Sequence, residues 1–458
     1  MLRSFVPSRT DLASLLRLAG PIVAVQVGGM LMGVTDTVIM GHVSATELAA
    51  TALGNLYYYG LNSLGVGIVW VLDPVVSQAM GARDHDGAAL GIQRGVVLGL
   101  LLGVIASLLC LPAGPILTAL RQPADVVPRA TAFVLTSAPS LVFMLAFMTL
   151  RQCLQAMKHT EAIIATVVVG NLVNLGLNMV FVFGNLGFPA MGCVGSALAS
   201  VIARLVMLVM LLVLSRRTLG PMLRPWRPEA LRPWPLLRMF RMGLPIGLQN
   251  GVEFATFAGI SVLAGWFGAE AMGGHQVAIN FASLLFMVPL GIGSAGAVMV
   301  GHAIGAGDGA HARRVAGAAL VCGAGFMTFT AGLLLAMPGV FARLYTDVPG
   351  VLAVAVALLP IAGVFQVFDG LQVVAAGLLR GAGDTRAPLL ANVVGFWIVG
   401  VPVSLWLGFR EGMGVVGLWW GFVAGLVAVA VFLVLRVRVR LSRPLTRLRL
   451  EDEVAPRA

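Results

Sequence analysis

The sequence predicts an all-α polytopic membrane protein: 12 transmembrane helices in two six-helix lobes related by a parallel pseudo-two-fold repeat. Composition, the spacing of apolar runs and an internal repeat predict it. The 458 residues are 59% hydrophobic and only 11% charged, whereas soluble domains carry about 25% charged residues. The 57 glycines and 23 prolines are scattered through the apolar runs, which is typical of helices that pack closely in lipid.

The apolar stretches form two sets of six, and each stretch is long enough for a bilayer span of about 20 residues. The first set lies at 14–40, 50–80, 90–112, 130–150, 162–184 and 193–214. The second lies at 240–266, 272–303, 315–337, 350–379, 387–408 and 414–435. We therefore expect an N-lobe of residues 1–214, a cytoplasmic basic linker of 215–238, a C-lobe of 239–440 and a cytoplasmic tail of 441–458.

The two halves repeat each other. Pro21 aligns with Pro245, and Gly41 with Gly265, at an offset of 224 residues. The offset becomes 225 for residues 154–160 against 379–385, and 222 for residues 191–195 against 413–417. Six helices per unit is an even number, so both units insert the same way up, as parallel repeats. Two equivalent lobes are typical of a transporter, whereas a channel more often assembles its pore from several short subunits.

The net charge of +11 indicates membrane orientation rather than nucleic-acid binding. Lys158 is the only lysine, and the arginines cluster in short loops between apolar segments, without the continuous basic surface that nucleic acid requires. The side of the membrane that holds both termini carries 25 of the 30 basic residues, which predicts cytoplasmic termini. The first apolar segment has no cleavage site and is expected to remain as an anchor. The four cysteines show no CxxC spacing and are interpreted as buried apolar residues.

Four acidic residues fall within the predicted spans. An ionisable group deep in lipid costs about 3 kcal/mol, so each one requires a reason. Glu253 and Asp369 lie at a shared depth near mid-membrane, and Asp36 lies in the outer half of the first helix. Asp73 aligns with Ala297 in the repeat, so it either faces a cavity or extends its carboxylate towards water.

Polar side chains accompany these acids at helical spacing. Gln249 precedes Glu253 by four residues, and Gln366 and Gln372 flank Asp369 at three. Asn171, Asn174 and Asn178 form one stripe on the fifth predicted helix. Such stripes either line a functional cavity or hydrogen-bond between helices, and for the asparagines both interpretations remain open.

Two motifs invite an enzymatic interpretation. Residues 291–296 match GxGxxG but no strand precedes them, so they are interpreted as close-packing glycines. Residues 305–308 and 381–384 both read GxGD, and their position beside basic residues favours cytoplasmic turns. HExxH, a Walker loop and a Ser/His constellation are absent from the sequence, so we expect neither an enzyme nor an ATP-driven pump.

At several of these residues the chain resembles the multidrug and toxic compound extrusion (MATE) transporters, and among them the NorM-like branch. The residues that carry the resemblance are HQVAIN at 275–280, FMVPLG at 286–291, RGAGDT at 380–385, and Asp36-Thr37 with Met40-Gly41. The resemblance implies secondary efflux of organic cations and amphiphilic drugs in exchange for Na⁺ or H⁺, by alternating access of two lobes and without another cofactor. We expect a monomer in the lipid bilayer of the bacterial cytoplasmic membrane.

The resemblance also implies site residues. Glu253 and Asp369 match the second-lobe acids of the NorM-like branch, and Asp36 with Asn174 and Asn178 matches a first-lobe cation site; Na⁺ is possible at either set. The predicted substrate cavity comprises Gln249, Asn280, Phe365, Gln372 and Asp73. An aromatic hydroxyl often precedes the second-lobe acid by one turn, and this chain has Phe365 there. That change keeps a cation–π face and removes an oxygen donor.

A flippase for lipid-linked precursors, from the same broad superfamily, is the alternative. Flippases usually carry cationic residues in the central cavity to hold a pyrophosphate. Here the ionisable residues at mid-membrane are acids, and Arg204 is the one basic residue that is assigned to neither a loop nor a terminus. The sequence therefore favours the antiporter over the flippase.

Overall fold

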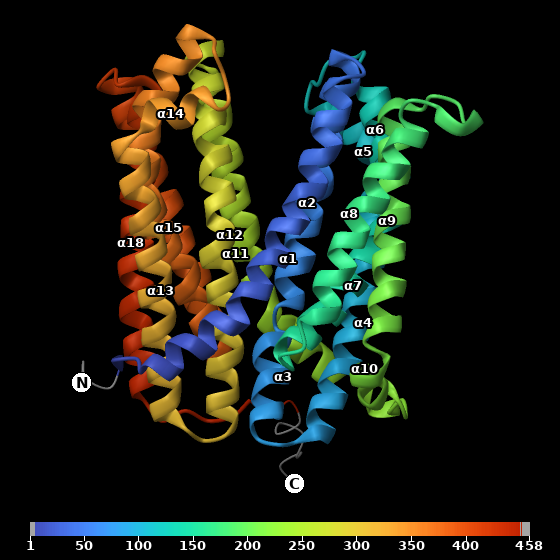
Figure 1. Ribbon diagram of the computed structural model, residues 1–458, viewed down its shortest axis with the longest axis vertical. Helices are drawn as coiled ribbons and strands as arrows, with labels where there is room; N and C mark the ends of the chain where they lie inside the picture. Colours follow the sequence, from blue (N-terminus) through green and yellow to red (C-terminus); the bar gives the residue numbers. More distant parts are fainter. Residues whose placement is uncertain (1–4, 449, 451–458) are drawn as a thin grey trace. The chain divides into compact units, whose positions relative to one another are not determined.

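The computed structural model describes residues 5–448 and residue 450, and these residues are helical with no strand (Figure 1). The first half contains α1 (Arg9–Gly41), α2 (Ala45–Val69), α3 (Leu72–Gly81), α4 (His85–Leu109), α5 (Ala113–Ala119), α6 (Val127–Ser137), α7 (Ser140–Ala156), α8 (Glu161–Phe181), α9 (Gly192–Leu214) and α10 (Arg216–Leu223). The second half contains α11 (Pro233–Gly265), α12 (Ala269–Gly305), α13 (Gly309–Ala336), α14 (Pro338–Arg343), α15 (Pro349–Gly381), α16 (Arg386–Asn392), α17 (Val401–Leu405) and α18 (Gly414–Ser442). Short 3₁₀ turns occupy Asn185–Gly187 and Pro228–Leu231, and π-helical turns occupy Val393–Gly400 and Trp406–Arg410.

All twelve predicted spans coincide with helices in the described part of the chain. Ten segments are long and apolar enough to cross a membrane, and α6 with α7 makes an eleventh that bends by 47°. The remaining predicted span is α11, a continuous helix of 33 residues. The break between α6 and α7 falls at Ala138 and Pro139, where proline removes a backbone donor. The all-helical, two-lobe fold class is confirmed, and the protein is a multi-pass membrane protein.

The chain divides into two compact units, which we call the first-lobe and second-lobe units. The first-lobe unit holds residues 24–80 and 84–247 together with residue 450; the second-lobe unit holds described residues up to 23, then 81–83 and 248–448. These bounds differ from the expected lobes. The start of α1 belongs with the second lobe, and the start of α11 with the first. Both helices change unit two residues after a proline, Pro21 or Pro245, which are repeat mates.

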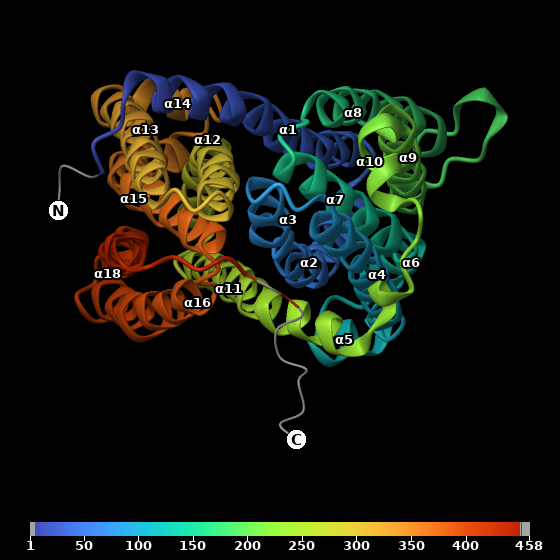
Figure 2. The same ribbon diagram turned by 90° about the horizontal axis from the view of Figure 1, so that it is seen from below.

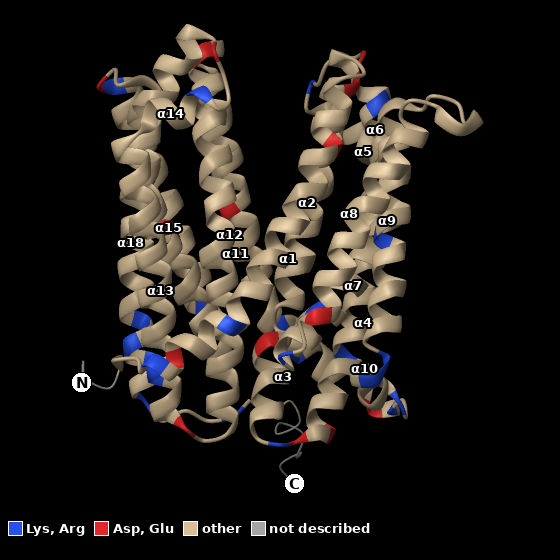
Figure 3. Ribbon diagram, in the orientation of Figure 1, with Lys and Arg blue, Asp and Glu red and all other residues tan. Residues whose placement is uncertain are grey.

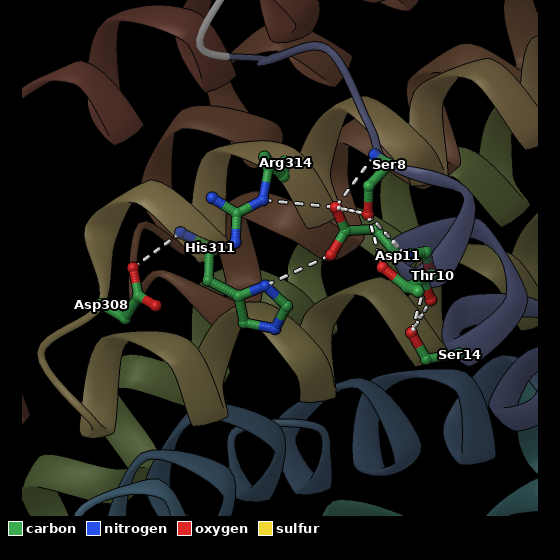
Figure 4. Close-up of polar contacts among 7 residues, drawn as sticks. All are labelled: Ser8, Thr10, Asp11, Ser14, Asp308, His311 and Arg314. Atoms are coloured by element: carbon green, nitrogen blue, oxygen red, sulfur yellow. Dashed lines mark hydrogen bonds and ion pairs between the residues drawn. The ribbon is translucent and has the colours of Figure 1, made fainter.

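A polar cluster holds the start of α1 within the second-lobe unit (Figure 4). Asp11 accepts hydrogen bonds from the backbone and hydroxyl of Ser8 at 3.0 and 2.7 Å. Its carboxylate also lies 3.3 Å from Arg314 Nε and 3.4 Å from His311 Nδ1, both on α13. Further along α1, Leu15 and Ile22 are buried in an apolar core formed with α12, α13, α15 and α18. Polar contacts and apolar burial thus explain why this half-helix groups with residues three hundred positions away.

The backbone repeats the same unusual conformations in both halves. Arg83 and its mate Gly307 have positive φ angles of 57° and 75°, and Lys158 and its mate Gly383 have 65° and 76°. The residues next in sequence to the first pair also match, since Asp84 caps α4 and Asp308 caps α13 with 2.8 Å hydrogen bonds. The structural repeat therefore confirms the sequence offset. It also shows that the two GxGD stretches are turns at helix ends, as predicted.

The segment predicted as a basic linker is structured. It contains α10 and the turn Pro228–Leu231, and α11 begins at Pro233, five residues before the predicted end of the linker. Of the last predicted segment, 441–458, the structure describes residues 441–448 and 450, and the rest lies outside the described residues. Within each unit, Lys and Arg residues gather mainly towards one end of the helices (Figure 3). Figure 2 shows the same helices along their axes.

Candidate functional site

The first-lobe unit contains a buried polar cluster around Asp36. Asn178 Nδ2 donates to Asp36 Oδ1 at 2.8 Å, and Ser200 Oγ donates to Asp36 Oδ2 at 3.0 Å. Asn174 Nδ2 reaches the same serine hydroxyl at 3.2 Å. Three helices supply these groups: α1 carries the acid, α8 the two asparagines and α9 the serine. The predicted association of Asp36 with Asn174 and Asn178 is thus present in the structure.

The oxygen atoms of this cluster are suited to a monovalent cation. The side-chain oxygens of Asn174 and Asn178 are buried and have no hydrogen-bond partner. Such orphaned oxygens are costly unless something satisfies them. Together with the Asp36 carboxylate they form an all-oxygen set of one charged and two neutral groups, the kind of ligand that hard cations prefer. In the described part of the chain, no group of three or more His, Cys, Asp or Glu side chains is placed to hold a metal ion.

The third asparagine of the stripe has a different role. Asn171 Nδ2 donates to the backbone oxygens of Gly28 at 2.9 Å and Val167 at 2.8 Å. It therefore joins α8 to α1 through the main chain and does not reach Asp36 among the described contacts. The sequence left cavity lining and helix joining open for the asparagines, and the structure assigns Asn171 to helix joining.

A second polar cluster lies in the second-lobe unit around Glu253 on α11. Gln372 Nε2 on α15 donates to Glu253 Oε1 at 3.2 Å, and Asn392 Nδ2 on α16 donates to Glu253 Oε2 at 3.4 Å. One carboxylate oxygen of Asp369 and the amide oxygens of Gln372 and Asn392 are buried without a partner. The two carboxyl groups are close enough to repel each other when both are ionised. A bound cation or proton would relieve that repulsion.

A cavity of about 240 Å³ adjoins these two acids. Its wall contains Glu253 and Asp369 and is otherwise mainly apolar. The remaining lining residues are Phe254, Phe257, Ile279, Ala282, Ser283, Phe286, Met287 and Phe365. Four phenylalanine rings and a methionine provide polarisable faces for an aromatic guest, and the carboxylates provide negative charge. The lining contains no basic residue.

Phe365 is held in place by an aromatic cluster. Its ring centroid lies 6.1 Å from that of Phe257, 5.2 Å from that of Phe422 and 5.5 Å from that of Trp419. Trp419 in turn donates to His275 Nδ1 at 3.2 Å. The histidine of the HQVAIN stretch thus lies behind the cavity wall rather than in it. Its role is to anchor Trp419 and, through Ser261 at 2.9 Å, α11.

The other predicted cavity residues lie elsewhere. Gln249 is buried on α11. Asn280 lies on α12, where its side-chain oxygen accepts a hydrogen bond from Gln276 Nε2 at 3.1 Å. Neither residue lines this cavity. Asp73 belongs to the first-lobe unit, is fully buried and accepts a hydrogen bond from Gln152 Nε2. It therefore does not extend towards water. Gln372 contacts Glu253 but is not part of the cavity lining. Of the five predicted residues Phe365 alone is in that lining, and the assignment of all five to substrate binding remains a prediction.

Sequence reasoning missed two residues of these clusters and one residue that contacts a buried arginine. Ser200 and Asn392 supply hydrogen bonds to the two acids, and Tyr58 contacts Arg204. Ser200 lies four residues before Arg204 on α9, and a polar pair at that spacing inside an apolar helix is a usable signal. Tyr58 has Asn62 four residues later on α2, a similar signal, whereas Asn392 has no polar neighbour at that spacing.

The chain is similar to known proteins over most of its length. The model of the family MatE matches residues 21–180 and 245–406. "Multidrug resistance protein NorM" of Aliivibrio fischeri is 35% identical over 97% of this chain and 98% of its own length. "Probable multidrug resistance protein NorM" of Pseudomonas aeruginosa is 34% identical over 96% and 92%.

Solved structures show the same fold at lower identity. The structure described as "Crystal structure of eukaryotic MATE transporter AtDTX14" has a TM-score of 0.85 at 22% identity, covering 94% of this chain and 98% of that one. An "outward-facing conformation of a multidrug resistance MATE family transporter of the MOP superfamily" has a TM-score of 0.86 at 19% identity, covering 94% and 96%.

Proposed function

We propose a function from one premise: this chain belongs to the MatE family. In this proposal the protein is a secondary antiporter that exports cationic amphiphilic compounds in exchange for Na⁺ or H⁺. The observation that carries the proposal is the cavity in the second-lobe unit, where two carboxylates meet an aromatic wall. The names of the relatives, which are multidrug resistance proteins, support the same substrate class.

The chemistry of this cavity favours flat organic cations. A positive charge gains from Glu253 and Asp369, and an aromatic body gains from the phenylalanine faces at about 0.5–2 kcal/mol per cation–π contact. An anion would meet two like charges and no compensating basic residue. Apolar walls with a flexible methionine accept varied shapes, which supports a broad substrate range.

Exchange follows if drug and ion weaken each other's binding. Such coupling is reciprocal, because each ligand changes the affinity for the other by the same factor. A drug cation and a coupling cation that compete for the same carboxylates fulfil this condition directly. One ion moving down a tenfold gradient supplies about 1.4 kcal/mol, which sustains a tenfold drug gradient. Alternating access of the two lobes would carry the occupied site from one side of the membrane to the other.

The flippase alternative is not favoured. A pyrophosphate group requires cationic side chains in the cavity, whereas the ionisable residues of this cavity are acids. Arg204 lies in the first-lobe unit and is hydrogen-bonded to Tyr58 and Ser140.

The remaining features of the proposal concern location and assembly. We propose that the protein works as a monomer in the bacterial cytoplasmic membrane with both termini in the cytoplasm. The distribution of Lys and Arg along the sequence supports this orientation. The bacterial relatives support the membrane.

Transport by the purified protein tests the proposal. Proteoliposomes loaded with ethidium are given an inward sodium gradient or an inward proton gradient, each at zero membrane potential. We expect one of the two gradients to drive export of ethidium. An anionic dye of similar size should remain inside the proteoliposomes under both gradients. Absence of ethidium movement under both gradients, or preferential export of the anion, would contradict the function.

A further inference from the structure

Arg204 is a buried cation with neutral partners. It lies on α9 with 8% of its surface exposed. Its NH1 group donates to Tyr58 Oη at 2.7 Å and to Ser140 Oγ at 2.6 Å, and its guanidinium carbon lies 4.6 Å from the centre of the Tyr58 ring. No carboxylate within the described residues forms an ion pair with it. A guanidinium cannot lose its charge in a protein, so the first-lobe unit carries a permanent positive charge in its interior.

The nearest compensation for that charge is Asp36. Ser200 lies four residues before Arg204, on the same face of α9. Its hydroxyl donates to Asp36 Oδ2 at 3.0 Å. About one helical turn therefore separates Arg204 from Ser200, the residue that contacts the Asp36 carboxylate. The charges of Arg204 and Asp36 attract each other without direct contact.

The internal repeat shows that these polar residues occur as a set. At the offsets found in the sequence, Asp36 corresponds to Ile260, Ser200 to Phe422 and Arg204 to Leu426. The partners of the arginine follow the same rule, because Tyr58 corresponds to Ala282 and Ser140 to Phe365. All five equivalent residues belong to one apolar core cluster of the second-lobe unit. Where the acid is lost, the arginine and its hydrogen-bond partners are lost with it.

The converse holds for the second-lobe acids. Glu253 corresponds to Gly29 and Asp369 to Met144 in the first half. Their amide partners also belong to the second-lobe unit, and no basic residue lines the cavity beside them. Of the two acid clusters, only that of Asp36 therefore has a buried arginine associated with it.

We propose that Arg204 is a fixed counter-charge for Asp36, which makes the empty first-lobe site electrically neutral and so weakens its hold on a coupling cation. The proposal rests on the proposed function for its purpose, since an exchanger must release its ion. A buried carboxylate with only neutral neighbours would bind a cation strongly, because the bound state would remove an uncompensated charge. With Arg204 present, cation binding adds a positive charge to a site that is already neutral.

Sodium binding to the purified protein tests this directly and without transport. The measurement is the sodium concentration that gives half of the maximal rise in melting temperature, at a pH where carboxyl groups are ionised. Replacing Arg204 by Gln should lower that concentration by about tenfold or more. The variant lacks a positive charge that repels the sodium ion, and this repulsion is significant at an effective dielectric constant near 20. Arg204→Lys, which restores the charge, should return it towards the wild-type value. An unchanged concentration in Arg204→Gln would overturn the proposal.

Matched variants separate charge from hydrogen bonding. Tyr58→Phe and Ser140→Ala remove the neutral partners but keep the guanidinium, and should leave the sodium concentration within about threefold of wild type. Arg129→Gln removes an arginine of the same unit that is already paired with Glu47, and should behave likewise. The effect of Arg204→Gln must also disappear in an Asp36→Asn background; a shift that persists there would place the interaction elsewhere and refute the assignment.

A stability cycle covers the case in which Arg204→Gln alone folds poorly. Asp36→Asn leaves a buried cation uncompensated and Arg204→Gln leaves a buried anion, so each should lower the melting temperature. The double variant Asp36→Asn/Arg204→Gln removes both charges. Its melting temperature should be higher than the value obtained by adding the decreases of the two single variants. Strict additivity would show that the two residues do not compensate each other. Either outcome is independent of dye transport, so it is distinguishable from failure of the proposed function.

Discussion

Three acids differ in the charge of the groups that contact them. Glu47, at the start of α2, is paired with Arg129 and accepts from the backbone of Cys193 at 2.6 Å. Its charge is satisfied within the protein. Asp36 and Glu253 instead receive hydrogen bonds from uncharged amides and a hydroxyl. An amide orients a carboxylate without neutralising it, and among the described residues neither acid is in direct contact with a basic side chain, so both carboxylates remain open to contact with a cation.

Neutralising the candidate coupling acids should stop transport in a protein that still folds and inserts. We expect Glu253→Gln, Asp369→Asn and Asp36→Asn each to reduce gradient-driven dye export to the level of empty liposomes. The amides keep the shape of the site and lose the charge that competes for the ion. Export is measured in proteoliposomes after the protein amounts have been matched by gel filtration.

The control for this prediction is Glu47→Gln, which removes an acid outside both clusters and should retain export. If the three neutralised variants insert correctly, stay monodisperse and pump at the wild-type rate, the acids are not the coupling sites.

At the scale of elements, glycine determines how closely α12 and α15 approach. A Cβ atom added at Gly377 would lie 2.7 Å from the carbonyl carbon of Gly293. Real Cβ atoms do not come that near to a backbone, so only glycine permits this crossing. The GxGxxG stretch of residues 291–296 is therefore a packing surface. The two helices also carry parts of the cavity wall, which makes their spacing relevant to the site.

Gly377→Ala should consequently destabilise the protein. Overpacking of a tight interface costs about 1–3 kcal/mol, which outweighs the gain of up to about 1 kcal/mol from replacing a helical glycine. The measurement is the melting temperature of the purified variant in detergent. Gly332→Ala is the matched control, because a Cβ there meets nothing within 4 Å, and it should be neutral or stabilising. Equal melting temperatures for the two variants would contradict the packing argument.

A second feature at the scale of elements is the attachment of the predicted basic linker, residues 215–238, to α4. Gln93 Nε2 donates to the backbone oxygens of Met222 at 3.0 Å and Pro225 at 3.1 Å, and its Oε1 accepts from the backbone of Arg227 at 2.9 Å. One fully buried side chain thus satisfies three main-chain groups of the segment. These bonds explain why a proline-rich, basic stretch is ordered.

Gln93→Leu should loosen this segment while leaving the helices intact. Three main-chain groups lose their partner, at about 1 kcal/mol for each bond. We expect hydrogen exchange in a peptide covering residues 222–229 to accelerate by at least about tenfold, because 1.4 kcal/mol corresponds to a factor of ten. Gln122→Leu removes a glutamine whose side-chain amide donates to the nearby Leu120 backbone oxygen, and it should leave that peptide unchanged. Protection equal to wild type in Gln93→Leu would show that other contacts hold the segment.

At the scale of the whole molecule, two halves with the same backbone plan carry different chemistry. The repeat preserves turns and caps, as the pairs Arg83/Gly307 and Asp84/Asp308 show. It does not preserve the polar clusters, whose members are replaced by apolar residues in the other half. Main-chain geometry tolerates such replacement because a cap or a turn depends on few side chains, whereas a buried polar cluster is stable only when all its members are present.

The predicted orientation is a property of the whole chain and can be tested by labelling. In a variant whose native cysteines are replaced by serine, a cysteine at Thr46 or Asp347 should react with an impermeant maleimide added to intact cells. A cysteine at Arg224 should react only after the cells are opened, because the segment rich in arginine stays in the cytoplasm. The reverse pattern would refute cytoplasmic termini.

The sequence by itself determined the fold class, the number of spans, the repeat and which acids lie within the spans. Each of these depends on local information: an apolar run long enough for a bilayer, a fixed offset, or a charge where lipid makes charge costly. Tertiary structure alone decided which neighbours the acids have. Asn392 reaches Glu253 across 139 positions, and Ser200 reaches Asp36 across 164. It also decided that Asp73 is buried against Gln152 and that half of α1 belongs with the second-lobe unit. Helical periodicity states which face of a helix is polar, but the partner of that face is set by how the helices pack.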